Sequence, residues 1–292
     1  MTIDLKGRVA IVTGAGGGLG RTHALALARY GAKVVVNDMS QAGVDAVVAE
    51  IVATGGDALP AICSVTDREA VSAMVQTAVD LWGSIDIVVN NAGILRDRTF
   101  AKMDLDDFEA VIAVHLMGSV NVTKAAWPHM QAKGYGRVIF TTSSSGLYGN
   151  FGQSNYGAAK MALVGLMQTL ALEGRKFGIH VNCLAPSAAT RMTEALYSES
   201  DLKGLSSDLV SPGVVALAAE GAPTRTILLA GGGAFEQAHI TMTQGVHVGD
   251  AADAAEQVQA QWARIDDRSN ELVPESGAEQ YKHEVRHTLQ PA

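Results

Sequence analysis

Short apolar runs alternate with helical patterns along most of this 292-residue chain. Seven of the runs have the length of a strand, and they cover residues 9–13, 33–37, 58–63, 85–90, 137–141, 180–184 and 226–230. Their apolar residues lack the period of two that marks a sheet with one solvated face, so we expect both faces to be covered. The stretches between the runs are long enough for right-handed helical crossovers. The alternation therefore predicts an α/β fold built on a doubly wound, parallel sheet of seven strands.

A glycine-rich turn follows the first of these strands. Gly14, Gly18 and Gly20 stand between the run at 9–13 and an apolar helical stretch from 22 to 30. Glycines allow a backbone to approach a ligand closely, and the free N–H groups of a helix N-terminus can bind a pyrophosphate. Asp38 closes the second strand, near the usual distance for an acidic residue that contacts the adenosine ribose. Both signals favour a dinucleotide as the ligand.

Ser143, Tyr156 and Lys160 form the strongest catalytic signal. Lys160 follows Tyr156 by four residues in a helix-compatible stretch, so both side chains share one face. A free tyrosine has a pKa near ~10, and a neighbouring cation lowers that value because it favours the phenolate. Tyr156 can then act as a general base toward an alcohol or as an acid toward a ketone. The alternative is a surface Tyr and Lys on an ordinary helix, which the glycine-rich turn disfavours.

The composition is that of a single α/β domain without a membrane segment. The formal net charge of −8 and the pI near 5.4 argue against a broad surface for nucleic acid or membrane. No apolar run reaches the ~18 residues of a membrane span, and residues 1–8 lack the pattern of a secretory signal. Cys63 and Cys183 have no metal-ligand spacing. We therefore expect buried free thiols, no metal site, and a cytoplasmic or equally reducing location.

Three motifs, in this order, resemble those of the short-chain dehydrogenase/reductase family. They are Gly14-x3-Gly18-x-Gly20, Asn90-Asn91-Ala92-Gly93 and Ser143-x12-Tyr156-x3-Lys160, and the resemblance extends from about residue 5 to residue 235. It implies a Rossmann fold in which Tyr156 is the catalytic acid or base and Ser143 orients the substrate oxygen. Lys160 would lower the pKa of the phenol and hold the nicotinamide ribose.

The same resemblance implies a nicotinamide cofactor. Asp38 can accept hydrogen bonds from both ribose hydroxyls but would repel a 2′-phosphate, so we expect NAD rather than NADP. Two of the expected cofactor positions depart from the family pattern: Ser187 replaces the glycine after Pro186, and Ser64 replaces the aspartate before Val65. The expected cofactor-binding residues are Gly14, Gly18, Leu19, Gly20, Asp38, Ser64, Val65, Asn91, Ala92, Gly93, Tyr156, Lys160, Pro186, Ala188, Ala189 and Thr190.

Residues 1–240 are expected to form the NAD-binding domain, and residues 241–292 a C-terminal extension. The family resemblance places a substrate-binding lid at about 188–208, where the pattern is weakest; a plain surface loop is the alternative. In the extension, an amphipathic pattern at 251–265 puts Val258, Trp262 and Ile265 on one stripe. We expect this stripe to pack on the core or on a neighbouring subunit. Family members assemble as homodimers or homotetramers through two long helices, which correspond here to 106–131 and 155–175.

Longer runs narrow the resemblance to one subgroup, the (3R)-hydroxyacyl-CoA dehydrogenase units of peroxisomal multifunctional enzymes of type 2 and their bacterial relatives. The runs include 90–100, 114–119, 146–153, 185–186 and 191–193. They imply oxidation of a (3R)-3-hydroxyacyl-CoA to the 3-oxoacyl-CoA, with Ser143, Tyr148 and Gln153 at the substrate. His115 takes the place of an asparagine of the family's proton relay. A catalytic role in that relay and a role as a buried packing residue both stay open.

Two other functions fit the same residues. A dehydrogenase of a steroid or another bulky secondary alcohol would use the same catalytic set without CoA. A dinucleotide-binding module without activity would not need Ser143, Tyr156 and Lys160 together, so their presence disfavours it. For an acyl-CoA substrate, Arg96, Arg98 and Lys102 are candidate cations for the charged nucleotide, with a solvated surface position as the alternative for each.

Overall fold

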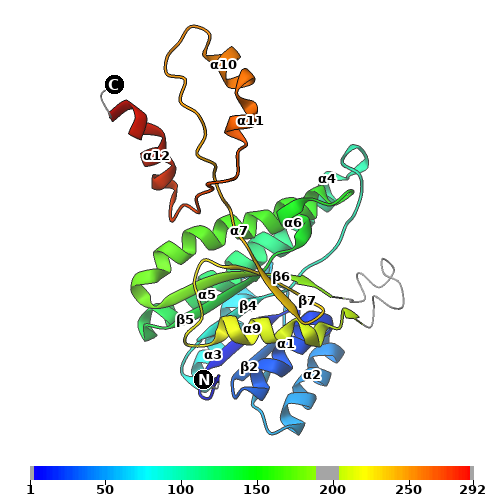
Figure 1. The fold of residues 1–292 in the computed structure, drawn as a ribbon. Coiled ribbons are helices and arrows are strands. Elements are labelled where there is room, and N and C mark those ends of the chain that lie inside the picture. Colours follow the sequence, from blue (N-terminus) through cyan, green and yellow to red (C-terminus); the bar gives the residue numbers. More distant parts are fainter. Residues whose placement is uncertain (1–2, 189–203, 290–292) are drawn as a thin grey trace. The chain divides into compact units, whose positions relative to one another are not determined.

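The computed structural model describes residues 3–188 and 204–289 (Figure 1). The chain divides into two compact units, Met1–Gln237 and Ala238–Ala292. Most of the expected lid, with Ala189 and Thr190, lies outside the described residues.

The first unit is built on one sheet with the strand order β3-β2-β1-β4-β5-β6-β7-β8. Strands β1 to β7 pair in parallel, which confirms the predicted fold class. The eighth strand was not predicted; Gly232 and Gly233, at φ of 57° and 81°, make a two-residue turn into it. The strands are β1 Val9–Thr13, β2 Lys33–Asp38, β3 Ala58–Ile62, β4 Ile87–Asn90, β5 Gly136–Thr141, β6 Ile179–Ser187, β7 Ile227–Gly231 and β8 Ala234–Ala238.

The strand register brings the carboxyl ends of the central strands to one edge. Thr13 of β1 pairs with Asn37 of β2, and Val12 pairs with Val89 of β4. The chain leaves β1 toward β2 on one side and returns to β4 on the other, so the strand order reverses between β1 and β4. In an open α/β sheet, such a reversal opens a crevice for a ligand beyond the strand ends.

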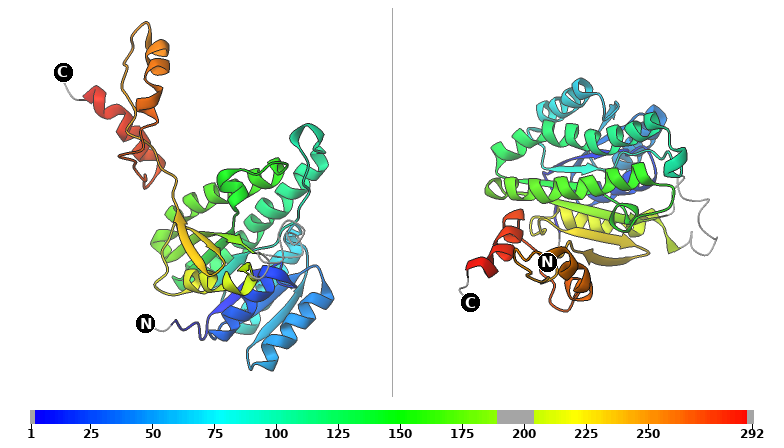
Figure 2. Two further views of the ribbon diagram at one scale, coloured as in Figure 1. Left: turned by 45° about the vertical axis from the view of Figure 1, so that its right-hand side comes forward. Right: turned by 90° about the horizontal axis from the view of Figure 1, so that it is seen from above.

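Helices cover both faces of the sheet (Figure 1 and Figure 2). Helices α1, α2 and α9 pack on one face, and α3, α5 and α7 on the other. The helices of this unit that position the site are α1 Gly18–Arg29, α2 Gln41–Ala53, α3 Arg68–Trp82, α4 Leu105–Ile112, α5 Gly118–Lys133, α6 Ser144–Tyr148, α7 Ser154–Gly174 and α9 Ser211–Ala218. No described helix is long and apolar enough to cross a bilayer.

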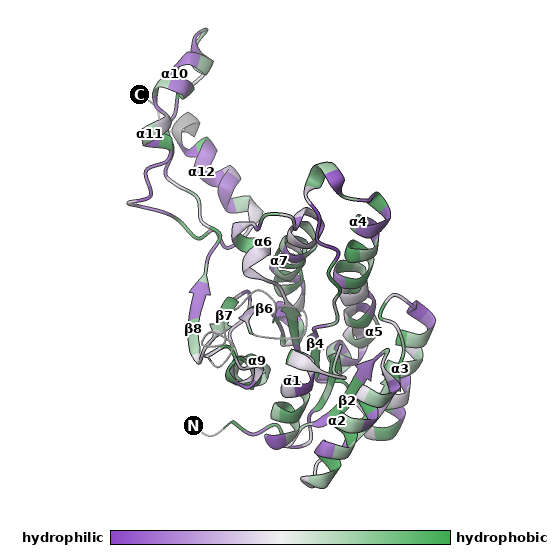
Figure 3. Cartoon of the chain, turned by 90° about the vertical axis from the view of Figure 1, so that its right-hand side faces the viewer, coloured by the Kyte–Doolittle hydropathy of each residue, from purple (hydrophilic) through white to green (hydrophobic). Residues whose placement is uncertain are grey.

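The core lies between the sheet and these helices. All five residues of β1 and all four of β4 are buried, and Figure 3 shows the hydrophobic colouring of β4. Leu27 of α1, Val47 of α2 and Val214 of α9 pack against the strands in one apolar cluster. Burial on both faces explains why the strands lack a polar alternation in the sequence.

One helix prediction differs from the structure. The expected helix at 106–131 is interrupted by a π-helical turn, Ala113–Met117, between α4 and α5. A further contact joins α9 to α1. Ser211 is the first residue of α9, and its buried hydroxyl lies 2.9 Å from Nδ1 of His23 on α1.

The second unit contains the helices α10 Ala254–Ala260, α11 Trp262–Ile265 and α12 Gly277–Leu289. A backbone pair between Met242 and Leu272 closes the segment that carries α10 and α11, with N–H to O distances of 2.9 and 2.8 Å. Of the residues described in this unit, none is buried, and Figure 3 shows α12 as mostly hydrophilic. Trp262 of the predicted stripe is 65% exposed.

Candidate active site

The glycine-rich turn after β1 is tied to the loop after β4. The Asn91 amide donates to the carbonyl oxygens of Thr13 at 3.0 Å and Gly14 at 3.3 Å. In return, the Thr13 hydroxyl accepts the backbone N–H groups of Asn91 and Ala92, both at 3.0 Å. These bonds hold the two loops together where the strand order reverses.

The glycines are needed for this close approach. A Cβ on Gly20 would lie 2.1 Å from the Gly14 carbonyl oxygen, and one on Gly14 would lie 2.9 Å from the Ala92 Cα. Gly14 also has φ of 63°, which favours glycine. The residue before α1 is Gly17, so no side chain caps the helix and its first N–H groups face the turn.

Asp38 borders the same turn. Its carboxylate accepts N–H bonds from Gly16 at 3.1 Å and Ser40 at 2.9 Å. A groove of about 350 Å³ runs beside it, and its lining comprises Gly14, Gly16, Gly17, Gly18, Leu19, Gly20, Asp38, Ser40, Asn91 and Gly93. Uncapped N–H groups and a carboxylate in the lining of one groove fit the pyrophosphate and the ribose of a dinucleotide.

Further expected cofactor residues lie at the carboxyl ends of β3 and β6 or outside the described residues. Val65 is buried, its carbonyl oxygen accepts a 2.9 Å bond from Asn121, and Ser64 bonds to Thr66 at 2.8 Å. Pro186 ends β6 together with Ser187, and Ala188 follows as a buried residue. Arg21 forms an ion pair with Glu50 of α2, so it is not free to bind a phosphate.

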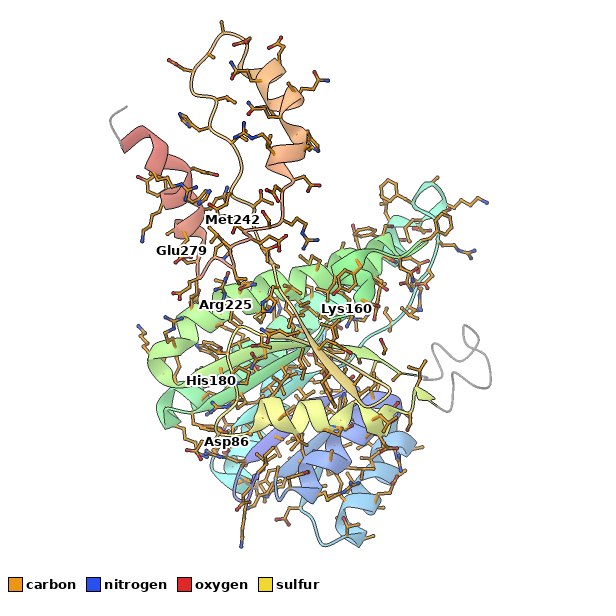
Figure 4. All side chains as sticks on the ribbon, viewed as in Figure 1. Asp86, Lys160, His180, Arg225, Met242 and Glu279 are labelled. Carbon is orange, nitrogen blue, oxygen red and sulfur yellow. The ribbon has the colours of Figure 1, made fainter. Side chains whose placement is uncertain are left out.

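The predicted catalytic side chains meet at the carboxyl edge of β5. Ser143 follows β5 and caps α6, where its hydroxyl accepts the Ser145 N–H at 3.2 Å. Tyr156 and Lys160 both lie on α7, with the ammonium 5.4 Å from the centre of the phenol ring. Lys160 is buried, and its Nζ donates to the Thr141 carbonyl oxygen of β5 at 2.5 Å; Figure 4 labels it at α7.

Burial is the largest cause of the shifted pKa values at this site. It raises the pKa of Tyr156, while the Ser143 hydroxyl opposes the shift and the negative charge of Asp97 adds to it. It also lowers the pKa of Lys160 to about 7. The expectation that Lys160 lowers the pKa of the phenol below its usual value is therefore not met in this structure, because desolvation of the phenolate outweighs the favourable interactions.

His115, in the π-helical turn, packs edge to face against the ring of Tyr156. Its Nε2 faces the backbone of Ile94, 2.8 Å from the carbonyl oxygen and 3.0 Å from the nitrogen. Its buried Nδ1 has no partner among the described residues. Burial, aided by the charge of Lys160, lowers the pKa of His115 to about 3, so the ring is neutral at physiological pH.

The expected substrate residues differ in their surroundings. Tyr148 is 67% exposed, whereas Gln153 is buried and its side chain bonds to Ser145 and Asp97. Among the candidate cations, Arg96 pairs with Asp107 of α4 at 3.3 Å, and Arg98 and Lys102 are exposed.

Three polar residues near the site were not predicted. Thr13 joins the two cofactor loops, Asn155 bonds the Arg96 carbonyl oxygen at 2.9 Å, and Asp97 accepts from Gln153 at 2.7 Å. Thr13 ends a strand beside the glycines, a position that could have drawn attention to it. Nothing in the sequence around Asp97 indicates its hydrogen bond with Gln153, 56 residues away.

Of the expected thiols, Cys183 is buried as predicted, but Cys63 is only half-buried, and both are free. Within residues 3–188 and 204–289, no group of three or more His, Cys, Asp or Glu side chains is placed to hold a metal ion.

A groove beside a glycine-rich turn, together with Ser, Tyr and Lys side chains at the same edge of the sheet, defines an oxidoreductase that uses a nicotinamide cofactor on a CH–OH group. A family model described as short chain dehydrogenase matches residues 8–201, and the chain belongs to this family.

Two relatives show how far the similarity extends. The chain is 46% identical over 279 residues to a short-chain type dehydrogenase/reductase of Mycobacterium tuberculosis. The matched region covers 92% of this chain and 97% of the relative. The chain is 45% identical over 286 residues to peroxisomal multifunctional enzyme type 2 of Mus musculus, and this match covers 94% of this chain but 38% of that enzyme.

Two solved structures are similar to this chain in fold and sequence. Full-length peroxisomal multifunctional enzyme type 2 from Drosophila melanogaster superposes with a TM-score of 0.84 at 36% identity, over 99% of this chain and 51% of that one. A 7α-hydroxysteroid dehydrogenase, solved with NADH and 7-oxo glycochenodeoxycholic acid, has a TM-score of 0.74 at 28% identity, over 79% of this chain and 95% of that one. The chain thus spans about half of the multifunctional enzyme of Drosophila melanogaster and less than half of that of Mus musculus.

Proposed function

We propose that this protein is an NAD-dependent dehydrogenase that oxidises (3R)-3-hydroxyacyl-CoA to 3-oxoacyl-CoA. The observation that carries the proposal is the meeting of Ser143, Tyr156 and Lys160 at the sheet edge that also carries the groove beside the glycine-rich turn. The similarity to multifunctional enzymes of type 2 over nearly the whole chain supports the choice of substrate.

In this proposal, one residue of the site transfers the proton and others position the substrate and the cofactor. Bound NAD supplies the hydride acceptor. Tyr156 takes the proton of the substrate hydroxyl, or returns it to the ketone in reverse, and Ser143 holds the substrate oxygen beside the phenol. Lys160 holds the nicotinamide ribose and, when protonated, favours the phenolate. Tyr148 and Gln153 lie on the substrate side.

Asp38 supports NAD as the preferred cofactor. Its carboxylate is fixed against the glycine turn by Gly16 and Ser40, where it can accept bonds from two ribose hydroxyls. A 2′-phosphate at the same place would meet a like charge. The proposed cofactor set also includes Gly14, Gly18, Leu19, Gly20, Ser64, Val65, Asn91, Ala92, Gly93, Pro186, Ala188, Ala189 and Thr190.

We assign His115 to the catalytic set as a positioning residue rather than a charged one. Its ring supports the edge of Tyr156 and bonds Ile94 in the loop that follows β4. A neutral imidazole with a free Nδ1 can also pass a proton through a water molecule. His115→Asn should keep most of the turnover, because its amide can bond Ile94, whereas His115→Phe should lose it.

A steroid or another bulky secondary alcohol is the second candidate substrate. The similarity to 7α-hydroxysteroid dehydrogenase favours it. A module without activity is disfavoured by the intact catalytic set.

The remaining proposals concern assembly and location. Exposed Met161 and Leu172 on α7 support a homodimer or homotetramer formed through α5 and α7. Residues 1–240 would be the NAD-binding domain with its lid at 188–208, and the exposed stripe of the extension at 241–292 would be covered by the core or another subunit. The two free thiols suit the cytoplasm or another reducing compartment. Light scattering at micromolar concentration tests the assembly, and a monomer would refute it.

The function is tested by NADH formation, measured at 340 nm, with a panel of 3-hydroxyacyl-CoA esters and a panel of steroid alcohols. We expect the CoA esters to be preferred at least tenfold in kcat/KM. Equal rates on a CoA-free steroid would favour the second candidate, and no NADH with either panel would refute both.

A further inference from the structure

Asn155 is a buried asparagine that directly precedes Tyr156 on α7. It is 0% exposed, and its Oδ1 accepts the backbone N–H of Tyr156 at 2.7 Å. The side chain of Gln153, the residue before α7, makes no cap bond, and the first N–H groups of a helix have no partner within the helix. The Asn155 side chain therefore fixes the backbone of Tyr156 at a point where the helix itself offers no acceptor.

The other end of the same amide holds the loop that follows β4, residues 91–99. Its Nδ2 donates to the Arg96 carbonyl oxygen at 2.9 Å and to Sδ of Met103 at 3.4 Å. This loop also carries Gly93, which lines the groove beside the glycine-rich turn. One buried side chain thus joins the backbone of Tyr156 to the loop that borders the groove.

A second contact joins the phenol ring to the same loop. The imidazole of His115 packs on the Tyr156 ring with the ring centres 5.2 Å apart, and its Nε2 lies 2.8 Å from the Ile94 carbonyl oxygen. Asn155 holds the backbone of Tyr156, and His115 holds its ring. Because both contacts lead to residues 94–96, the position of the phenol follows the position of the loop.

We propose that Asn155 is a positioning residue for the dehydrogenase reaction, which holds Tyr156 in register with the loop that borders the cofactor. This inference rests on the proposed function and refines it. Proton and hydride transfer require one geometry, and a misplacement of about 1 Å can lower the rate about 10²-fold. Since Asn155 is fully buried, it acts through Tyr156 and the loop rather than by contact with the substrate.

Asn155→Ala removes both bonds and tests the proposal. We expect kcat with a 3-hydroxyacyl-CoA ester to fall at least about tenfold. The dissociation constant for NAD, measured by calorimetry, should stay at the wild-type value, because Thr13 still holds the start of the loop through Asn91. A second variant, Asn155→Asp, keeps an acceptor for the Tyr156 N–H, but an ionised carboxylate has no donor for Arg96. Its kcat should fall as well.

Asn182→Ala is the matched control. Asn182 of β6 is 1% exposed, and its amide also joins two backbone groups, the Pro223 carbonyl oxygen at 2.8 Å and the Thr226 N–H at 2.9 Å. These two groups lie just before β7 rather than at Tyr156. Both Ala variants should lower the urea midpoint of unfolding, because each leaves buried backbone groups without a partner. Only Asn155→Ala should lower kcat.

A wild-type kcat in a folded Asn155 variant, or an equal loss of kcat in Asn182→Ala, would overturn the inference. Failure of both Asn155 variants to fold, while Asn182→Ala folds, would show a structural role and overturn it as well. If the wild type oxidises a steroid alcohol instead of a CoA ester, the same comparison is made with that alcohol, so the inference can stand where the proposed substrate fails. A wild type that oxidises neither would refute both.

Discussion

The imidazole of His115 meets the ring of Tyr156 edge to face, with the ring centres 5.2 Å apart and the planes at 88°. The π-helical turn that carries His115 widens the helix locally and brings the ring into this position. Gly93 makes the space, because a Cβ there would lie 2.2 Å from Cε1 of His115. The loop of the cofactor groove and the catalytic tyrosine are thus connected through one histidine.

Gly93→Ala should force His115 to move. We expect a loss of about 1–3 kcal/mol in the free energy of unfolding, measured by urea titration, together with slower turnover. Gly221→Ala in the exposed turn after α9 is the control, because nothing lies within 4 Å of its new Cβ. That variant should keep its stability or gain up to about 1 kcal/mol. Equal losses in both variants would contradict the steric account.

Tyr156→Phe removes only the phenolic oxygen. We expect turnover to fall by about 10²–10⁴ while the affinity for NAD, measured by calorimetry, stays within about twofold. Tyr281→Phe changes an exposed tyrosine of the second unit and should leave both quantities unchanged. Turnover near the wild-type value in Tyr156→Phe would remove this residue from the mechanism.

Lys160 should leave a signature in the pH dependence of stability. Its pKa is about 7 in the folded protein against 10.5 for an ordinary lysine. Between these values the unfolded chain binds a proton that the folded chain does not, so stability rises with pH through this window. Relative to Lys160→Met, the wild type should gain about 2 kcal/mol of unfolding free energy between pH 7 and pH 9. A difference that is independent of pH would show that Lys160 keeps an ordinary pKa.

Asp38 should determine the choice between NAD and NADP. Replacing it by Ala and Met39 by Arg removes a like charge and adds a partner for the 2′-phosphate. We expect the ratio of kcat/KM for NAD over NADP to fall by at least about 100-fold, since such a charge contact is worth several kcal/mol. A wild-type enzyme that already uses NADP as well as NAD would show that Asp38 does not select the cofactor.

The parallel sheet could be predicted because each buried strand leaves an apolar run between helical patterns. The convergence of Gly14, Asn91 and Ser143 could be predicted as well, because each follows a strand and parallel strands end at one edge. Strand β8 was missed, although Gly232-Gly233 is a hairpin signal.

Other features depend on contacts between distant segments. Nothing near Asp97 in the sequence indicates that Gln153 will hold it, and the hydroxyl of Ser211 bonds to His23, 188 residues away. The direction of the Tyr156 pKa shift required the burial of the ring, which no local spacing encodes. Such features follow only from the assembled fold.

The stereochemistry of the reaction tests the central claim most directly. The fixed positions of Tyr156 and the cofactor groove admit one enantiomer productively. Initial rates of NADH formation should be compared for resolved 3R and 3S 3-hydroxyacyl-CoA esters under identical conditions. The account predicts that the 3R ester is oxidised at least 100-fold faster than the 3S ester, in line with the energetic value of a correctly oriented reacting pair. Oxidation of the 3S ester alone, or equal rates for both enantiomers, would contradict it.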